Sequence, residues 1–439
     1  MNKYAVVLIF FFLRTICLAL NAKACGAKGD GIQDDSPYLN DAIQKALFLG
    51  EDLFIPCGTY KCEQFSSGYT KILRMDQSGV KKIRIYGEAG TKITTSQALG
   101  CILYIYNKNE NVTIEHIFFE NTHRITMAQT NAIQLLGTNQ NSIHNFTIQH
   151  CRFEGFSTAI SGQGVKGFVI QNNIFASPRG HDNAQDNSQP AAYIWLADNS
   201  NGQCFDVEIL NNEVSGYTGS DITKTTTLRP MDGFVIAIAY GILIKGNTMR
   251  NFSEEHIVLQ PKITFVHSTD SAWITENHFY QAIPSGSMKK GSLLDANYGI
   301  RAECNNLMIT DNSFHDYSLG ILMRPFEFPK LTAHTITITG NKFSSAGSKV
   351  YHVREAIKIQ GCAAYPASDI IILNNVITVG GIQVKSNRAV ISLYDCKNVN
   401  IQNNTITGQD IDLNGYAFSG LLTERCINLV SEKNHIRLK

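Results

Sequence analysis

The sequence has 439 residues, with 38 lysines and arginines against 37 aspartates and glutamates, which gives a formal net charge of +1 at pH 7. This balance excludes the strongly basic surface that is typical of nucleic-acid-binding proteins. The chain also has no glycine-rich phosphate loop and no HExxH or GxSxG motif, so nucleotide, zinc-protease and serine-hydrolase chemistry have no support.

The first residues predict an export signal. Lys3 gives a positive start, residues 5–20 form an apolar stretch too short for a transmembrane helix, and Ala22-Lys23-Ala24 suits cleavage. We therefore predict a signal peptide over residues 1–24 and a mature protein, from Cys25 onward, that is secreted or periplasmic and not held at a membrane. Lipidation of Cys25 is an alternative.

Ten cysteines follow the predicted cleavage site. In an oxidising compartment Cys57 is able to pair with Cys62, or Cys25 with either of them. Free buried thiols fit the sequence equally well, so the disulfide pairing stays open.

An amphipathic helix is predicted at the start of the mature chain. Asp35 or Ser36 can cap its first turn, Pro37 suits that turn, and Gly50 ends it. Its apolar side chains fall on one face and are Leu39, Ala42, Ile43, Ala46 and Leu47. We expect this helix, within a segment over residues 25–60, to cover the open end of a repetitive fold.

The rest of the chain repeats an eight-residue pattern: apolar, any, apolar, any, any, Asn, any, apolar. "ITITGNKF" at Ile336–Phe343 is one copy. The copies begin at Val112, Phe146, Phe168, Val207, Ile242, Ala272, Leu307, Ile336, Ile370 and Val399, with a degenerate last copy around Asn434. The first two copies lack the asparagine and have Ile117 and Cys151 in its place. Successive copies lie 22 to 39 residues apart, which is the spacing of solenoid repeats.

The apolar positions inside each copy alternate, which predicts strands rather than helices. A second apolar run precedes most copies, so each repeat supplies at least two short strands joined by sharp turns. Stacked repeats bury what one repeat cannot, and the turn asparagine can bond to the next copy. The sequence thus predicts an all-β, single-stranded right-handed parallel β-helix of about eleven coils, forming one domain over residues 25–439.

The segment GAKGDG-x-x-DD-S, followed by the helix and "IPCGTY", resembles the N-terminal part of pectin-lyase-like β-helix proteins. That superfamily includes polygalacturonases, pectate-lyase-like enzymes and phage tailspike depolymerases. The motif covers residues 26–60, and the repeats extend the resemblance along the mature chain. The resemblance implies the same β-helix and a polysaccharide partner.

The outward side of the second strand of each repeat is the candidate binding face. Because neighbouring coils stack about 4.8 Å apart, aligning these strands on Val235, Ile257 and Ile300 places Asp232 beside Glu254 or Glu255. The same alignment places on the outward side Trp195, Gln260, Arg301, Glu303, Arg324 and Lys358. The ring of Trp195 either stacks on a sugar or packs beneath a loop.

Three long connections precede this row of strands, at residues 176–192, 215–231 and 281–295. Long loops in a compact solenoid are usually functional or disordered. We expect these three to build walls along one edge of the face, where carboxylates beside a cationic strip suit an acidic or neutral glycan.

Two short segments resemble polygalacturonase motifs. "MDGF" at 231–234 is similar to Asn-Thr-Asp-Gly, and "SEEHI" at 253–257 to Gly-Asp-Asp-Cys, which implies catalytic roles for Asp232, Glu254 and Glu255. Met231 and the two glutamates depart from the family pattern, and no Gly-His-Gly follows. Paired carboxylates are what glycoside hydrolysis needs, one as acid and one as base or nucleophile. We predict a secreted polysaccharide hydrolase of polygalacturonase-like type that needs no cofactor.

Two other functions stay open. A polysaccharide lyase needs a base for the C5 proton and a cation for the uronate carboxylate, and Arg301, Arg324, Lys358, His256 and Tyr298 supply these types; Ca²⁺ between the carboxylates is then possible. A β-helix that binds or assembles exopolysaccharide without turnover is the other alternative. The sequence leaves the oligomeric state and the identity of the sugar open.

Overall fold

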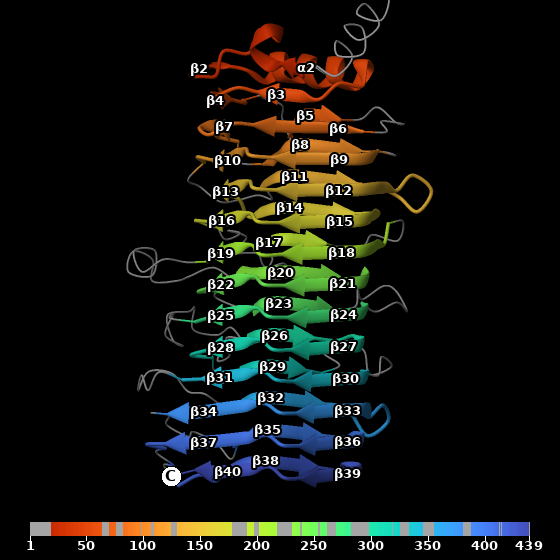
Figure 1. Cartoon of the computed structure of the whole chain (residues 1–439), viewed down its shortest axis with the longest axis vertical. Helices are drawn as coiled ribbons and strands as arrows, with labels where there is room; N and C mark the ends of the chain where they lie inside the picture. The colour runs from red at the N-terminus through yellow and green to blue at the C-terminus, as the bar shows by residue number, and fades with distance from the viewer. Residues whose placement is uncertain are drawn as a thin grey trace, which may run out of the picture.

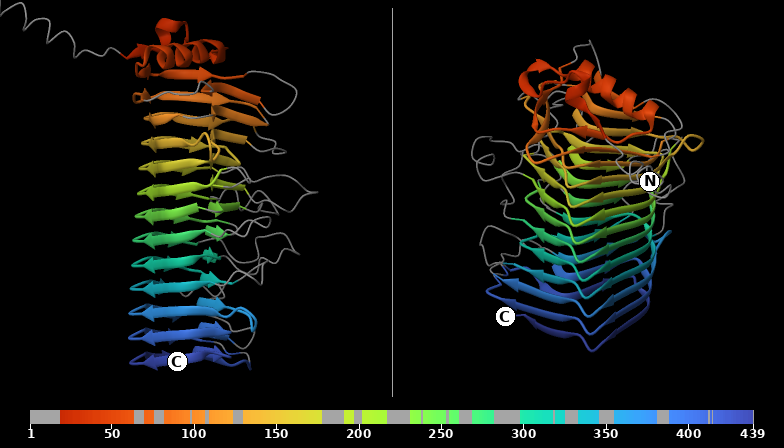
Figure 2. Two further views of the ribbon diagram at one scale, coloured as in Figure 1. Left: turned by 90° about the vertical axis from the view of Figure 1, so that its right-hand side faces the viewer. Right: turned by 45° about the horizontal axis from the view of Figure 1, so that its top comes forward.

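The computed structural model describes residues 19–63, 70–75, 82–97, 99–106, 109–123, 130–177, 191–196, 202–216, 231–237, 239–252, 255–260, 269–281, 298–317, 319–324, 333–345, 355–380, 388–411, 413 and 415–438. They form a ribbon wound into a rod of stacked coils (Figure 1). Three parallel sheets run along the rod, with 14, 14 and 12 strands, and we name them A, B and C. From β3 onward, successive strands of the chain go to sheets A, B and C in turn, so strands paired within a sheet are one coil apart (Figure 2). The predicted parallel β-helix is confirmed.

Sheet A consists of β1 (Leu20–Asn21), β3 (Leu53–Ile55), β6 (Ile83–Gly87), β9 (Glu110–Glu115), β12 (Ile143–Gln149), β15 (Val165–Gln171), β18 (Cys204–Leu210), β21 (Ala239–Lys245), β24 (Asp270–Thr275), β27 (Asn305–Thr310), β30 (His334–Thr339), β33 (Ala367–Leu373), β36 (Cys396–Gln402) and β39 (Ile427–Glu432). Sheet B consists of β2 (Asp30–Asp34), β4 (Gly58–Lys61), β7 (Thr91–Thr95), β10 (Phe118–Asn121), β13 (Arg152–Glu154), β16 (Ile174–Ala176), β19 (Glu213–Ser215), β22 (Thr248–Arg250), β25 (His278–Tyr280), β28 (Ser313–His315), β31 (Lys342–Ser344), β34 (Val376–Gly380), β37 (Thr405–Gln409) and β40 (His435–Leu438). Sheet C consists of β5 (Thr70–Met75), β8 (Gly100–Tyr106), β11 (Thr130–Leu136), β14 (Thr158–Gln163), β17 (Ala191–Leu196), β20 (Met231–Ala237), β23 (Glu255–Gln260), β26 (Tyr298–Ala302), β29 (Leu319–Met323), β32 (Glu355–Gln360), β35 (Arg388–Tyr394) and β38 (Phe418–Glu424).

The repeat pattern accounts for only part of this architecture. The eleven copies in the sequence correspond to the sheet A strands from β9 to β39, and β1, β3 and β6 lie ahead of them. Those first three strands have no copy of the pattern, so the coil number predicted from it is too low. Each coil also has a third, short strand in sheet B, which the pattern contains only as its last residues after the asparagine.

The interior of the rod is a continuous apolar core with identical side-chain types stacked coil upon coil. The rings of Phe279 and Phe314 lie 4.8 Å apart, and those of Phe314 and Phe343 lie 4.6 Å apart, both stacked. Full burial of one such side chain stabilises the fold by about 1.5–3 kcal/mol. Because each contact joins neighbouring coils, the core also holds their register.

A ladder of asparagines, all but the last of them buried, closes the turn between sheets A and B. Its members are Asn173, Asn212, Asn247, Asn277, Asn312, Asn341, Asn375, Asn404 and Asn434. The backbone N–H and side-chain amide of each donate to Oδ1 of the next; for Asn277 both distances to Asn312 are 3.0 Å. The same amide of Asn277 donates at 2.9 Å to the Ile244 carbonyl of the preceding coil. The predicted structural role of these asparagines is therefore confirmed.

The N-terminal end of the rod carries the predicted cap. Helix α2 spans Ser36–Leu49, buries the five predicted apolar side chains, and ends at Gly50 in the left-handed conformation, with φ 66°. Asp35 precedes it, but its carboxylate accepts hydrogen bonds from the backbone N–H groups of Lys28 and Gly29, at 2.7 and 3.0 Å, and does not cap the helix.

The predicted signal peptide lies mostly outside the described residues and stays a prediction. Its last residues are part of the cap: β1 pairs with β3, and Ala22, in the 3₁₀ helix η1 (Ala22–Cys25), is fully buried. Cleavage after Ala24 would remove β1 and three residues of η1 from this cap.

None of the helices in the described segments is long and apolar enough to cross a bilayer. The ten cysteines of these segments are free thiols, with Cys57 exposed and Cys62 buried.

Replacing Asn277 by alanine tests the ladder. The change removes the acceptor of the buried Asn247 backbone N–H and a donor to the Ile244 carbonyl, so we expect the free energy of unfolding to fall by about 3 kcal/mol. Denaturant titration measures it. Asn400→Ala, on the outward side of β36, is the control and should cost at most about 0.5 kcal/mol. Equal losses in both variants would contradict a special role of the ladder.

Candidate functional site

The outer face of sheet C carries three columns of side chains, which we name by their place along the strands. The first outer column contains Ala192, Asp232, Glu255, Tyr298, Leu319 and Glu355. The second outer column contains Trp195, Val235, Val258, Arg301, Leu322 and Lys358. The third outer column contains Ala237, Gln260, Glu303, Arg324 and Gln360, which pair in register or directly follow residues that do. The residues between the second and third columns, such as Leu259, belong to the core.

The register differs by one residue from the sequence alignment. Phe234, and not Val235, pairs with Ile257. The run "FVIAIA" is apolar throughout, so its pattern does not fix which residues face inward. The structure places Asp232 level with Glu255, one of its two predicted neighbours, and the backbone N–H of Glu255 donates to Asp232 Oδ1 at 3.0 Å.

Carboxylates of the first outer column pair with cations of the second. Arg301 Nη1 lies 3.1 Å from Glu255 Oε1, and Arg301 Nη2 donates to Gln260 Oε1 at 3.1 Å. Lys358 Nζ lies 3.5 Å from Glu355 Oε2. Glu255 and Glu355 are 5% and 2% exposed.

Arg324 adds a third cation to the same face. Burial lowers the pKa of its guanidinium, and Arg301 nearby acts in the same direction, while Tyr298, Glu303 and Glu255 raise it. These five side chains therefore lie close enough to interact electrostatically. Arg301, Arg324 and Lys358 come from three consecutive coils and form what we call the cationic strip.

The structure brings together seven of the nine predicted site residues around this strip. Trp195 lies in the second outer column one coil before Val235 and packs against the cluster of Ala192, Val235 and Val258. Packing, one of its two predicted roles, is thus observed, and sugar stacking stays a prediction. Glu254 lies outside the described residues, as do most of the three long connections.

The glycine of "MDGF" has a packing role. A Cβ at Gly233 would lie 2.4 Å from Met249 Cε and 2.3 Å from the His256 carbonyl oxygen. Gly299 and Gly320 occupy the equivalent position on later strands of sheet C. A Cβ at Gly299 would lie 2.7 Å from the Phe314 ring, and a Cβ at Gly320 would lie 2.4 Å from the Phe343 ring. Close packing at this corner explains a glycine here without a catalytic motif, so the resemblance of "MDGF" to the polygalacturonase motif depends on Asp232 alone.

His256 does not reach the outer face, and its prediction as a candidate base there is wrong. It is fully buried at the inner corner, its Nε2 lies 2.7 Å from the Tyr317 hydroxyl oxygen, and its ring packs edge-on against Phe252. Burial lowers the pKa of His256 to about 3. The bend at the start of β23 turns His256 and Ile257 inward in succession, which a strict alternation does not predict.

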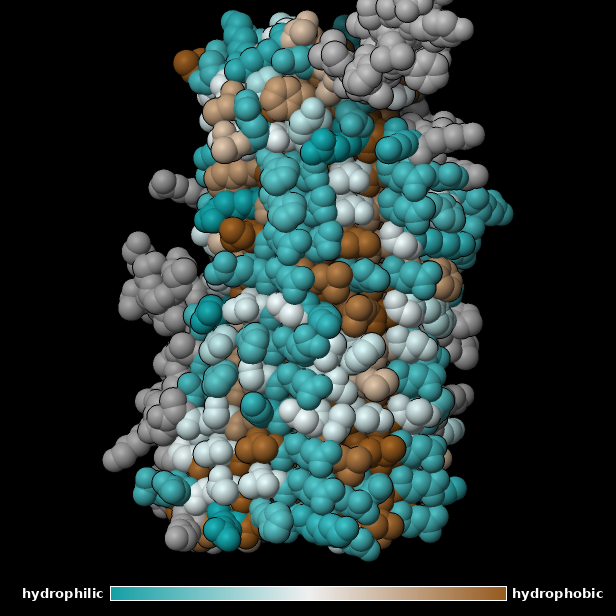
Figure 3. All heavy atoms as spheres, viewed as in Figure 1, coloured by the Kyte–Doolittle hydropathy of each residue, from teal (hydrophilic) through white to brown (hydrophobic). Residues whose placement is uncertain are grey.

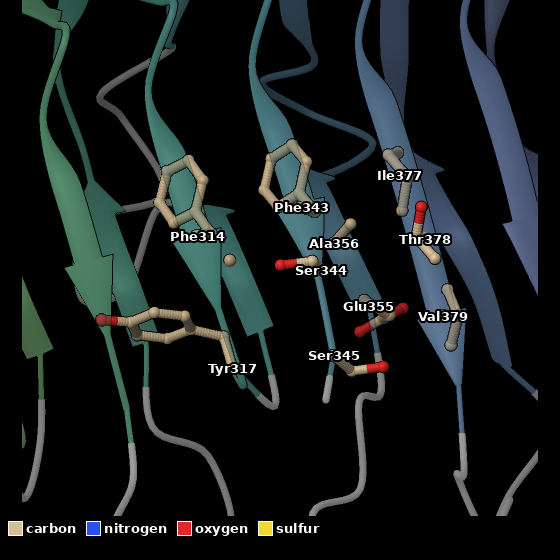
Figure 4. A pocket seen from close by; sticks show the side chains of 11 residues that line it. Phe314, Tyr317, Phe343, Ser344, Ser345, Glu355, Ala356, Ile377, Thr378 and Val379 are labelled. Carbon is tan, nitrogen blue, oxygen red and sulfur yellow. The ribbon is translucent and has the colours of Figure 1, made fainter. Parts of the chain in front are cut away.

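Sequence reasoning missed two features of this face. Lys358 Nζ lies 5.4 Å from the ring centroid of Tyr394, which pairs with Gln360. A pocket of about 270 Å³, partly open to solvent, adjoins Glu355 (Figure 4). Its lining includes Tyr317, Ser344, Ser345, Glu355, Thr378 and Val379. The alternating pattern gives no sign that Tyr394 differs from any other strand residue. The pocket lies between two sheets, so the pattern of a single strand cannot predict it.

Within the described segments, no three His, Cys, Asp or Glu side chains converge to hold a metal ion. The guanidinium of Arg301 already occupies one side of the Glu255 carboxylate. A calcium ion shared with Glu254 stays a prediction.

No protein-family model matches the sequence, and no curated protein sequence does. Solved structures do match. The A-module of mannuronan C-5 epimerase AlgE6 from Azotobacter vinelandii superimposes with a TM-score of 0.62 at 14% identity, covering 94% of this chain and all of that one. A mutant tailspike protein of Escherichia coli bacteriophage HK620, in complex with a pentasaccharide, gives a TM-score of 0.58 at 10% identity, covering 93% of this chain and 80% of that one. The fold is a right-handed parallel β-helix. At these identities the likeness concerns the fold alone.

The buried histidine gives a pH test. Its folded pKa of about 3 lies below the unfolded value near 6.5, so its contribution to stability is fully present above pH 6.5 and is lost as the pH falls toward 3. Between pH 6.5 and 4.5 the stability of the wild type relative to His256→Gln should fall by about 2 to 3 kcal/mol. Denaturant titrations at both pH values measure this. Exposed His435→Gln is the control, and a pH-independent difference for His256→Gln would contradict the assignment.

Proposed function

We propose that the protein is an enzyme that acts on a uronate-containing polysaccharide bound along the outer face of sheet C. The observation that carries the proposal is the cationic strip, in which Arg301, Arg324 and Lys358 come from consecutive coils and lie beside glutamates. Coils repeat about every 4.8 Å, a spacing comparable to the length of one sugar unit. One cation per coil therefore suits a polymer with one carboxylate per sugar.

The same groups suit removal of a proton from C5 of a uronate. A guanidinium on the substrate carboxylate stabilises the negative charge that develops there when the C5 proton leaves. Tyr298 is our candidate base, because it lies in the first outer column between Glu255 and Leu319, three residues before Arg301 on the same strand. Tyr298 also interacts electrostatically with Arg324, so a cation lies near its hydroxyl group.

Two products can follow from the resulting enolate. If the C4–O bond breaks, the polymer is cleaved by β-elimination and an unsaturated sugar forms. If a proton returns from the opposite face, C5 is epimerised and the chain stays intact. The AlgE6 A-module, which shares the fold, is named as a mannuronan C-5 epimerase, and this supports testing both outcomes. The predicted signal peptide supports a site of action outside the cytoplasm.

Hydrolysis is the second candidate, because Asp232 and Glu255 are level in neighbouring coils and joined through the Glu255 backbone. Arg301 forms an ion pair with Glu255, a position that suits a base or nucleophile rather than the acid. Asp232 or Glu254 would then have to supply the proton to the leaving oxygen. Binding without turnover is the remaining function.

One assay separates these functions. The protein is incubated in D₂O with mannuronan, polygalacturonate and a neutral xylan, and the products are followed by NMR, ultraviolet absorbance and reducing-end analysis. We expect deuterium at C5, or an unsaturated product, with a uronate polymer. New reducing ends without either signal would indicate hydrolysis, and an unchanged polymer that is still bound would indicate a binding protein.

Arg301→Ala should lower kcat/KM on the uronate polymer on the order of 100-fold, because a charge stabiliser is lost. Arg301→Lys should recover part of that loss. The matched control is Arg84→Ala, which removes a similar ion pair, with Glu115, from the outer face of sheet A. Unchanged turnover in Arg301→Ala, with the fold intact, would rule out the proposed site.

A further inference from the structure

The outer face of sheet A carries aromatic side chains on three consecutive coils. Phe205 on β18 and Tyr240 on β21 stack with ring centroids 5.2 Å apart and an interplanar angle of 16°. Trp273 follows on β24 and is 47% exposed. Figure 3 looks onto this side of the rod and shows hydrophobic atoms at several levels of a largely hydrophilic face. Aromatic groups here are not explained by the core, since they point away from it.

Apolar neighbours extend this surface along one column. Leu243, Trp273 and Met308 are paired in register on β21, β24 and β27, and Met308 is 43% exposed. We name the set of Tyr240, Leu243, Trp273 and Met308 the sheet A platform. It lies on a different sheet from the cationic strip.

The indole of Trp273 is held in place by hydrogen bonds. Its Nε1 donates to Thr310 Oγ1 at 3.0 Å, and Thr310 Oγ1 donates to Thr275 Oγ1 at 2.9 Å. Both threonines are buried and belong to neighbouring coils of the sheet. The ring is therefore oriented before any ligand binds, which reduces the entropy lost on binding.

Polar groups of both charges surround the platform. Asp270 accepts a hydrogen bond from Asn306 at 2.7 Å on one side, and Lys245 pairs with Glu276 at 3.1 Å on the other. No single sign dominates, in contrast to the cationic strip. The surroundings offer hydrogen-bonding groups to a ligand with many hydroxyls and do not select an anion.

The exposed apolar area is small for a protein partner. Half-exposed Trp273 and Met308 together offer on the order of 200 Å², whereas a stable protein interface buries about 800 Å² on each side. A single sugar ring, with its apolar C–H face and its rim of hydroxyls, matches an aromatic ring with polar neighbours. The column also runs along the rod, in the direction in which an extended chain could lie.

We infer that the sheet A platform is a second glycan-binding site, where a sugar ring of a polysaccharide strand stacks on Trp273. This inference goes beyond the proposed function, because binding here requires no catalytic group. The site would hold a long polymer on the face of the rod that does not carry the cationic strip.

Affinity electrophoresis in native gels that contain mannuronan, polygalacturonate, xylan or a soluble β-glucan tests the inference. We expect at least one polymer to retard the wild type, and Trp273→Ala to weaken that binding roughly 3- to 10-fold. Ile371→Ala is the matched control: Ile371 lies in the same column, three coils further on, and is 38% exposed. It should leave the binding unchanged, and circular dichroism checks the fold of both variants.

Arg301→Ala separates this inference from the proposed function. If both hold, this variant loses turnover but keeps the binding that depends on Trp273. If the proposed function fails, the effect of Trp273→Ala on retardation remains. Retardation unchanged by Trp273→Ala, an equal loss in Ile371→Ala, or no retardation of the wild type by any of the polymers would overturn the inference. Loss of a self-associated form in Trp273→Ala, without weaker glycan binding, would also overturn it and assign the platform to a contact between copies.

Discussion

The register between neighbouring coils is the constraint on which the rest of the structure depends. Backbone pairing in three parallel sheets sets the spacing, and the asparagine ladder together with the stacked phenylalanines sets the level of each coil. A slip of one residue would turn the core side chains of a strand outward. The buried amides add a second penalty, because each needs its partner in the next coil. The register is therefore fixed at every level of the rod.

That register turns distant residues into neighbours. Asp232 and Glu255 are 23 residues apart in the chain but level on the surface. Arg301 reaches back one coil to Glu255 and Gln260, and Lys358 holds Glu355 of its own strand. A face built in this way repeats at a spacing close to that of a polymer. The same regularity places Trp273 and Met308 in one column on the opposite sheet A, so two different chemistries arise on one scaffold.

The sequence predicts the fold more clearly than it predicts the site. The asparagine, with alternating apolar residues on its N-terminal side, marks the sheet A strands from β15 onward, and the capping helix has its own signals in Pro37 and Gly50. The first coils are missed because β1, β3 and β6 carry no copy of the eight-residue pattern. Near the start of a sheet C strand two successive residues face inward, as His256 and Ile257 do on β23. A register predicted from strict alternation is therefore wrong by one residue. This double step explains why the alternation pattern aligns Val235 in place of Phe234 and predicts His256 on the outer face. Arg301 and Lys358 lie beyond the same double step of their own strands, where the side chains alternate, so the sequence predicts their outward positions correctly.

The central claim is that the cationic strip binds the carboxylates of a uronate chain. A crystal structure of the protein with a short mannuronate or galacturonate oligosaccharide tests it most directly. The account predicts that the sugar lies along sheet C, with successive carboxylates against Arg301, Arg324 and Lys358. An oligosaccharide bound elsewhere on the rod, with these three side chains free of it, would contradict the claim.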